Sequence, residues 1–518
     1  MVSWTWLLPL AIILSSLIPG LLIFSLKERQ EKLRTFLNLT GALVKMALVG
    51  VMLYGVSNGV EFRFSLPFLP GGGLLLKGDA LSLQFVSLSS VLWLATTVYA
   101  IGYLEDSPLR SRFFGYFSLC VSATVGLALA GNLVTFLLFY ELLTLATFPL
   151  VVHRGTKAAL RAGRVYLVYT LAGGAVLLMG VVLLHTEAGT PDFVPGGYLS
   201  GMDSEGNFSS TVISGLAGER DFTLTVAFVL LVAGLGVKAA LIPLHGWLPQ
   251  AMVAPAPVSA LLHAVAVVKA GVFGLVRVVY DVYGIESVRE LHLNQPLLWL
   301  AAATIIYGSV RALEQRELKK RLAYSTVSQV SYIALGVALA GPLAATGALA
   351  HLVHQGLMKV TLFYCAGNFA ETLGVHRIEG MNGIGRRMPL TMAAFTLGAL
   401  GMIGVPPLAG FISKWYLGLG ALEVGQDWVL LILVASALLN AAYFLPLIYR
   451  GWFAAPPDEW PEDKRWPALH PLLGETHWML LLPALFTAVL SLLAGLLAGL
   501  DISPLAWGQL IVEREFAP

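Results

Sequence analysis

Charge is scarce in this chain of 518 residues: Asp, Glu, Lys and Arg together make up 12% of it. Soluble domains have roughly 25% charged residues, whereas 57% of this chain is hydrophobic. This composition leaves too little polar surface to cover a soluble fold, so the sequence predicts an integral protein of the lipid bilayer. The net charge of +2 gives no strong field that would attract nucleic acid.

Cysteine is nearly absent as well. Cys120 and Cys365 lie far apart in apolar runs and show no metal-ligand spacing, so we expect buried thiols. No glycine-rich nucleotide loop opens a helix after a strand. The triplet Gly71–Gly73 lies between short alternating runs, EFRFSL and LLLKGD, which favour a small hairpin. The residues therefore predict neither a cofactor nor a metal site.

Long apolar runs dominate what is present. A membrane-spanning helix needs about 20 apolar residues, and by this rule about fourteen helices are predicted. They cover residues 4–26, 36–57, 79–102, 113–130, 132–152, 164–185, 222–243, 257–281, 295–312, 322–341, 344–372, 390–418, 427–450 and 477–500. The first run has its basic residues after it and none before it, which favours an uncleaved span that begins on the outer face.

The loop charges agree with this orientation. The loops expected on the inner face contain Lys27, Arg29, Lys32, Arg34, Arg110, Arg112, Arg154, Lys157, Arg161, Arg164, the run from Arg311 to Arg321, Arg377, Arg386, Arg387, Arg450, Lys464 and Arg465. The outer loop 186–221 contains Glu187, Asp192, Asp203, Glu205, Glu219 and Asp221 against Arg220. Because cytoplasmic loops are enriched in Lys and Arg, both termini are expected on the outer face of a prokaryotic inner membrane.

Proline interrupts two of the predicted helices. The seventh contains LIPLHGWLP, with Pro243 and Pro249, and the twelfth contains GVPPLAG, with Pro406 and Pro407. Proline inside a helix frees backbone carbonyls, which lipid tolerates only against protein or a wet cavity. Because the breaks lie five helices apart, they predict two five-helix units of opposite orientation, a pattern typical of transporters.

This pattern divides the chain into four predicted parts. Residues 1–112 hold helices one to three and an outer hairpin. Residues 113–281 and 295–450 hold the two five-helix units, and residues 451–518 hold an inner loop and the last helix. The fold class is therefore an all-α polytopic membrane protein with broken helices seven and twelve.

Five ionisable residues interrupt the apolar runs: Glu141, Lys238, Lys269, Lys359 and Lys414. A charge at the middle of a bilayer costs roughly 2.5–3.5 kcal/mol on insertion scales, so five would cost about 12–17 kcal/mol. This rivals the whole stability of a typical domain, roughly 5–15 kcal/mol. Structural ion pairs, or lysines whose amines reach the interface, would explain single residues. The set as a whole predicts a function.

The chemistry that such a set allows is proton transfer. A lysine in a medium of low dielectric can gain and lose a proton at neutral pH, and a nearby carboxylate favours its charged form. A change in the separation of Glu141 and Lys238 would therefore load or release a proton at the lysine. The titrations of such neighbours are coupled.

Histidines near the lysines are candidates to bridge the gaps between them in a path of proton transfer. His263 precedes Lys269 by six residues, and His351 and His354 share one helix face. His354 and Lys359 lie about 140° apart around a helix, so they would act through water or neighbouring helices. Hydrogen-bonded packing is the alternative for His263 and His354.

Two further ionisable residues are interpreted as structural. Lys45 is isolated on the second helix, where an ion pair or an amine that reaches the interface would account for it. His245 lies at the break of the seventh helix.

At these residues the sequence resembles the antiporter-like subunits shared by Mrp cation/proton antiporters, respiratory complex I and membrane-bound hydrogenases. The matching segments are FYELLTLATFPLV, KAALIPLHGWLPQAMVAPAPVSALLHAVAVVKAGVF, KKRLAYSTVSQVSYIALG, HLVHQGLMKVTLFYCAG and GVPPLAGFISKWYLG. The resemblance covers roughly residues 60–450, and NAAYFLPLIYRGWF is most similar to the D-type Mrp subunit. It implies a fourteen-helix fold with two inverted five-helix units.

The resemblance also implies roles for individual residues. Glu141 and Lys238 match the glutamate and lysine of helices five and seven, and Lys269 matches the connecting lysine of helix eight. His354 and Lys359 match the relay of helix eleven, and Lys414 matches the terminal position of helix twelve. Gln329 stands where some members carry histidine, and glutamine cannot titrate.

The expected function is that of a proton-translocating subunit within a larger complex of integral membrane subunits. An Mrp-type Na+/H+ antiporter is the first hypothesis, and a redox-driven hydrogenase or complex I relative is the second. A non-transporting scaffold and a carbon-uptake complex are further alternatives. The path of Na+ is not indicated, because Asp281 and Glu371 lie at helix ends and form no acidic cluster within the spans.

Overall fold

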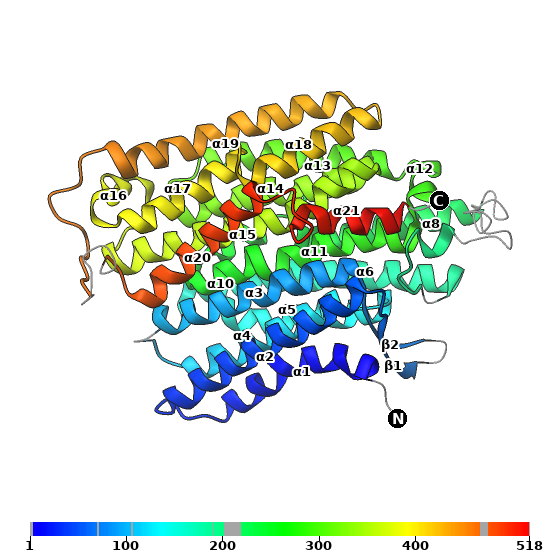
Figure 1. The fold of residues 1–518 in the computed structure, drawn as a ribbon, viewed down its shortest axis with the longest axis horizontal. Helices are drawn as coiled ribbons and strands as arrows, with labels where there is room; N and C mark the ends of the chain where they lie inside the picture. Colours follow the sequence, from blue (N-terminus) through cyan, green and yellow to red (C-terminus); the bar gives the residue numbers. More distant parts are fainter. Residues whose placement is uncertain are drawn as a thin grey trace.

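The structure is a computed structural model that describes residues 4–69, 72–104, 107–189, 191–200, 219–466 and 475–516. Its long helices lie side by side in one bundle, and both termini lie at the same end of it, beside a two-stranded hairpin (Figure 1). We call the opposite end, which holds the α1–α2, α3–α4 and α5–α6 loops, the basic end. Gly71, Asp203 and Glu205 of the predicted hairpin and outer loop lie outside the described residues.

Helices make up most of the described chain. The main ones are α1 Trp4–Phe24, α2 Glu31–Ser57, α3 Ala80–Tyr103, α4 Arg110–Ala128, α5 Leu133–Val151, α6 Lys157–Ala188, α8 Glu219–Ala239, α10 Ala256–Ala260, α11 Val267–Val276, α13 Asn294–Leu313, α14 Leu318–Leu339, α15 Pro342–Leu373, α17 Pro389–Ile403, α18 Ala409–Glu423, α19 Trp428–Phe453, α20 Trp478–Leu496 and α21 Pro504–Glu515. Short helices α9 Trp247–Gln250, α12 Ile285–Glu290 and α16 Ile384–Arg387 join them.

Eleven helical segments of the described chain are long and apolar enough to cross a membrane. The chain is therefore a polytopic membrane protein, as the composition predicts. Three more units, α4, α15 and the pair α17–α18, would bring the number to fourteen. That number, and the division into two inverted units, stay predictions.

The small hairpin predicted around the glycine triplet is confirmed. Strand β1 (Phe62–Leu69) pairs antiparallel with β2 (Gly72–Gly78), with Phe62 opposite Gly78. The hairpin is fixed to the α4–α5 turn, because Lys77 N donates to the Leu129 carbonyl at 2.7 Å. It lies at the end of the bundle that holds the termini (Figure 1).

Both predicted helix breaks are present. Helix α8 ends at Ala239, and irregular turns lead to α9, whereas α17 ends at Ile403 and α18 begins at Ala409. Carbonyls next to the breaks find side-chain donors. Trp247 Nε1 donates to the Val237 carbonyl at 2.7 Å, and Lys414 Nζ donates to the Ile403 carbonyl at 3.0 Å. The breaks are thus placed against protein, as a low-dielectric medium requires.

The most buried segments form the middle of the bundle. Every residue of the span Ala256–Tyr283 is buried, and α14 and α15 are nearly so. This central span is not a uniform helix: α11 lies between two π-helical segments, Leu261–Val265 and Arg277–Tyr283. Helices α1, α2 and α19 lie at the edges of the bundle (Figure 1) and expose apolar side chains.

A candidate proton-transfer axis

The seven side chains proposed from the sequence all lie within the bundle. The fully buried ones are Lys238, Lys269, Lys359, His263 and His354. Glu141 and Lys414 are partly buried. They come from α5, α8, the central span, α15 and α18, so the tertiary fold brings together positions that lie up to 273 residues apart in the chain (Glu141 to Lys414).

Glu141 and Lys238 form the first group. The Lys238 ammonium lies 3.3 Å from the centroid of the Tyr140 ring and donates to the Tyr140 carbonyl. Glu141 points toward α6, where a Cβ at Gly174 would overlap its carboxylate. The charges of Glu141 and Lys238 interact, yet the two side chains form no direct ion pair, and Glu141 Oε1 has no hydrogen-bond partner among the described residues.

Lys269 connects the helix of the first group with α15. It lies in α11, which packs on α8, the helix of Lys238. Its ammonium donates to the Leu352 carbonyl of α15 at 2.6 Å. Lys269 therefore contacts both the helix of the first group and the helix that carries His354 and Lys359.

The histidines lie between the lysines. His263 stacks on Phe363 with ring centroids 4.6 Å apart, and neither of its ring nitrogens has a hydrogen-bond partner among the described residues. A charge on His263 would interact with Lys359, and one on His354 with Lys269. His354 and Lys359 lie on different faces of α15, and a bridging role for the histidines stays a prediction.

Lys359 begins a continuous hydrogen-bonded network in the second half. Its ammonium donates to Ser325 Oγ at 2.6 Å and to the Leu322 carbonyl at 3.1 Å, both on α14. The Tyr443 hydroxyl donates to Ser325 Oγ at 3.0 Å and also contacts Asn440 Oδ1. Lys359 is thereby connected to α19.

The same network reaches Lys414 at the break between α17 and α18. Asn440 Nδ2 donates to the Met402 carbonyl at 3.3 Å, and Lys414 Nζ donates to that carbonyl at 2.7 Å. Gln329 donates to it as well, at 3.4 Å. The glutamine is therefore a hydrogen-bonding member of the network.

Sequence reasoning missed three members of this arrangement, Ser325, Asn440 and Tyr443, which connect Lys359 with Lys414. His351, which the sequence places on the helix face of His354, accepts or donates at Ser413 Oγ, 2.8 Å from its Nδ1. A charge on His351 would interact with both Lys269 and Lys414. The signal was present as polar residues inside apolar runs, in YSTVSQVSY and NAAYF, but such residues also pack without a function.

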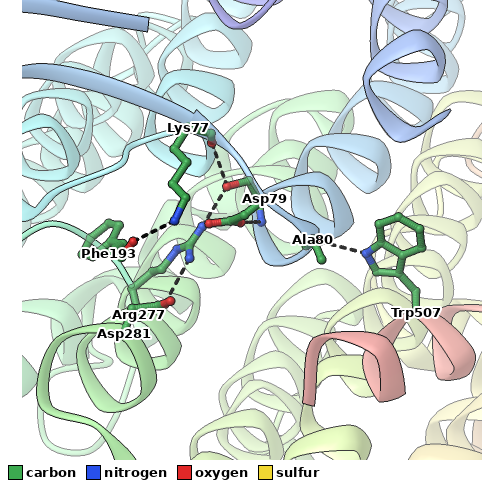
Figure 2. A network of polar contacts seen from close by, with 8 residues as sticks. Lys77, Asp79, Ala80, Phe193, Arg277, Asp281 and Trp507 are labelled. Carbon is green, nitrogen blue, oxygen red and sulfur yellow. Dashed lines mark hydrogen bonds and ion pairs between the residues drawn. The ribbon is translucent and has the colours of Figure 1, made fainter. Parts of the chain in front are cut away.

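A second charged cluster (Figure 2) lies beside the hairpin, at the end of the bundle that holds the termini (Figure 1). Arg277 donates to Asp79 at 2.8 Å and to Asp281 at 3.0 Å, and its side chain is 1% exposed. Lys77 donates to a carbonyl of the α6–α8 connection at 3.0 Å. Trp507 of α21 donates to the first carbonyl of α3 at 2.8 Å. Here the charges are paired directly, unlike those of the axis.

A metal or cofactor site is not evident. Within the described ranges, no group of three His, Cys, Asp or Glu side chains could hold a metal ion. Cys120 and Cys365 are buried free thiols.

The fold defines a polytopic helical membrane protein with ionisable side chains inside its bundle. Residues 130–440 match the transmembrane family described as NADH:quinone oxidoreductase/Mrp antiporter. The chain belongs to this family.

Relatives of this chain include both oxidoreductase subunits and antiporter subunits. The chain is 38% identical over 400 residues to NADH-quinone oxidoreductase subunit N of Desulforudis audaxviator (strain MP104C), in an alignment that covers 76% of each chain. It is 28% identical to the D-type Na(+)/H(+) antiporter subunit of Bacillus subtilis (strain 168), over 93% of this chain and 92% of that one. A chain of the Mrp complex from Dietzia sp. DQ12-45-1b superposes with a TM-score of 0.82 at 22% identity, over 99% and 98% of the two chains. That likeness shows the fold.

Proposed function

We propose that the chain is a proton-translocating subunit of a multisubunit Mrp-type Na+/H+ antiporter. Protons move along the axis formed by Glu141, Lys238, Lys269, His354, Lys359 and Lys414, with His263 beside it. The observation that supports this most is the placement of four lysines from four segments in one series of packed helices, with one carboxylate of the described residues, Glu141, interacting with one of them.

The contacts suggest a role for each group. Glu141 interacts with Lys238 without direct contact, so a small movement of α5 against α8 changes the charge balance at that lysine. Because the Lys269 ammonium donates to the Leu352 carbonyl, a change in the charge of Lys269 acts on α15. Lys359 and Lys414 are held at the two ends of one network, in which the Ser325 and Tyr443 hydroxyls take up one proton as they release another, while the Asn440 amide and the Met402 carbonyl fix the positions of Tyr443 and Lys414.

The subunit acts together with other integral membrane subunits, which supply the rest of the ion path. Mrp antiporters and respiratory oxidoreductases, to which the relatives belong by name, are complexes of several chains. The two units 113–281 and 295–450 each contribute one half of the axis, and both termini lie on the outer face of the membrane.

A redox-driven pump is the alternative. The identity of 38% to subunit N of an NADH-quinone oxidoreductase, against 28% to a D-type antiporter subunit, favours it. In that setting the same axis operates, and electron transfer in partner subunits supplies the driving force.

Replacement of Lys238 tests the axis. Lys238→Ala removes the ammonium that faces Glu141 and Tyr140, and we expect it to abolish ion-driven pH changes in vesicles that contain the whole complex. The exposed Lys157→Ala is the matched control and retains activity. Full activity of Lys238→Ala would refute the proposed axis.

Purification through this subunit tests which complex it serves. Gentle solubilisation followed by identification of the co-purifying chains and their iron content separates the two hypotheses. Small integral membrane partners without iron support the antiporter, whereas iron–sulfur or nickel partners replace it with the redox pump.

A further inference from the structure

The Lys238 ammonium has its two closest contacts with one residue, Tyr140. Tyr140 precedes Glu141 on α5, and its side chain is fully buried. The ammonium lies 3.3 Å from the centroid of the Tyr140 ring and donates to the Tyr140 carbonyl. Glu141 forms no direct ion pair with it, and Glu141 Oε1 has no hydrogen-bond partner among the described residues. Tyr140, and not the neighbouring carboxylate, therefore holds the ammonium in this structure.

The Tyr140 ring is itself fixed to the helix that carries Lys238. Its hydroxyl donates to the Gly234 carbonyl of α8 at 2.9 Å, one turn before Lys238. At Gly234 a Cβ would lie 2.7 Å from the Gly173 carbonyl oxygen, so α8 packs closely on α6 at this turn. The ring thus stays against α8 through a contact that does not involve Glu141.

The other buried lysines have no ring at this distance. Lys45, Lys414 and Lys359 lie 4.6, 5.2 and 5.9 Å from the centroid of an aromatic ring. Lys45 is fully buried, donates to Ser16 Oγ at 2.6 Å and interacts with no charged group of the described residues. Neither an ion pair nor an amine at the interface explains Lys45, but its contact is a hydroxyl. A ring in direct contact with the ammonium distinguishes Lys238 from these three lysines.

Few titratable groups surround Lys238. Its charge interacts with Glu141 of α5 and Cys120 of α4, and Tyr166 of α6 interacts with Glu141. On α11 the neighbour is Gly271, where a Cβ would lie 2.7 Å from the Lys238 carbonyl carbon. A buried ammonium that loses its counter-charge is costly. The face of an aromatic ring carries a negative partial charge that attracts a cation, so Tyr140 offers stabilisation that persists when the carboxylate moves away.

We propose that Tyr140 is a positioning residue of the first half, whose ring holds the charged form of Lys238 while Glu141 withdraws. The ring thereby sets the pH range over which this lysine carries its proton between two encounters with the carboxylate. The inference rests on the proposed transport function. No proton passes through Tyr140: its ring and carbonyl receive the ammonium, and its hydroxyl stays on Gly234.

Two substitutions at position 140 separate the ring from the hydroxyl. Tyr140→Phe keeps the ring, whereas Tyr140→Leu removes it. Ion-driven pH changes are measured with vesicles of the whole complex across a range of pH. We expect the alkaline limit of transport to move to lower pH by about one unit in Tyr140→Leu and to stay in place in Tyr140→Phe. A slower rate with an unchanged pH profile in Tyr140→Leu would show a structural role and overturn the proposal, as would equal shifts in both variants.

Tyr283 provides a matched control on the same helix. It is fully buried, its hydroxyl donates to the Leu224 carbonyl of α8 at 2.8 Å, and its ring packs on Phe228 with centroids 5.1 Å apart. Tyr283→Phe and Tyr283→Leu therefore remove the same groups at a distance from Lys238. We expect both to keep the alkaline limit of the wild type. A shift in Tyr283→Leu as large as that in Tyr140→Leu would show that a loosened α8 is the cause, and would overturn the proposal.

Ring fluorination keeps the test decisive if Tyr140→Leu fails to assemble. Phenylalanines with increasing numbers of ring fluorines, incorporated at position 140, keep the shape of the ring and weaken the attraction of its face for a cation. We expect the alkaline limit of transport to move stepwise to lower pH as fluorines are added. A limit that does not depend on fluorination would refute a role for the ring face.

The failure of this inference is distinguishable from that of the proposed function. In parallel samples, inactive Lys238→Ala together with unchanged pH profiles of the position 140 variants leaves the axis standing and removes only the role of Tyr140. Full activity of Lys238→Ala would instead remove the proposed function, and the role of Tyr140 with it.

Discussion

The two halves of the axis hold their lysines in different ways. In the first half, the Lys238 ammonium lies over the Tyr140 ring and interacts electrostatically with Glu141. In the second half, Lys359 and Lys414 are held by a serine hydroxyl and by carbonyls of α14 and the broken helix. Among the described residues, no carboxylate forms an ion pair with either of them.

This difference has a physical consequence. An ammonium near a carboxylate cannot lose its proton without leaving an uncompensated buried charge, which is costly. An ammonium on neutral acceptors leaves no such charge behind. The first half is therefore suited to a charge switch by movement, and the second half is suited to the passage of protons.

Among changes in the second half, loss of a lysine is expected to have the largest effect. Lys359→Ala removes the start of the network through Ser325 and Tyr443, and we expect ion-driven pH changes to fall about 100-fold or more. The measurement uses vesicles of the whole complex, with the half-exposed Lys320→Ala as control. Retained transport would show that the network is not part of the path.

A carboxylate added to the second half is expected to have an intermediate effect. Gln329→Glu places an acid on the side chain that now shares the Met402 carbonyl with Lys414. The pair resembles that of the first half and holds the proton on Lys414, so we expect transport to slow about tenfold, equivalent to about 1.4 kcal/mol. Gln315→Glu, at the basic end of α13, is the control. Unchanged rates would show that the lack of a carboxylate beside Lys414 does not affect transport.

Removal of one hydroxyl is expected to have a smaller effect. Tyr443→Phe deletes the group that joins Ser325 to Asn440 and leaves both lysines in place. One lost hydrogen bond corresponds to about 0.5–1.5 kcal/mol, so we expect transport to slow about threefold to tenfold. Tyr449→Phe, on the exposed side of the same helix, serves as control. A loss as large as that of Lys359→Ala would point instead to a structural role.

Substitutions in the ion-paired cluster of Arg277, Asp79 and Asp281, at the end of the bundle that holds the termini, should lower stability and leave transport nearly unchanged. Burial raises the pKa of Asp79, but the charge and hydrogen bond of Arg277, with Lys77 and the Ser82 amide, outweigh it and lower the pKa from 3.8 to about 2. A depressed carboxyl pKa stabilises the fold above pH 4, and this stabilisation is lost as the pH falls toward 2.

Asp79→Asn tests this assignment. We expect the variant to lose about 2 kcal/mol of unfolding free energy at neutral pH, measured by denaturation of the solubilised protein. The difference from the wild type should shrink below pH 4. A difference that does not depend on pH would show that the carboxylate charge is not the stabilising feature.

Much of the fold was predictable from local pattern. Apolar run length indicated most of the helix positions, and the proline pairs located both breaks, because proline has no amide hydrogen to donate. The π-helical segments around α11, which lie in the fully buried central span, were not predicted. The helix α21 was also missed, because its composition is too polar for a span.

For the candidate site, the sequence by itself determined which groups are ionisable and that they lie in apolar segments, because apolar runs mark the spans and a charge inside a span is costly. It did not determine what each group touches. Lys45 and Lys359 look alike in the sequence as single lysines in apolar helices, and Lys238 differs from them only through Glu141, 97 residues before it. Only the tertiary structure decided that the charge of one lysine interacts with a carboxylate while the others contact hydroxyls and carbonyls, because those partners come from other helices.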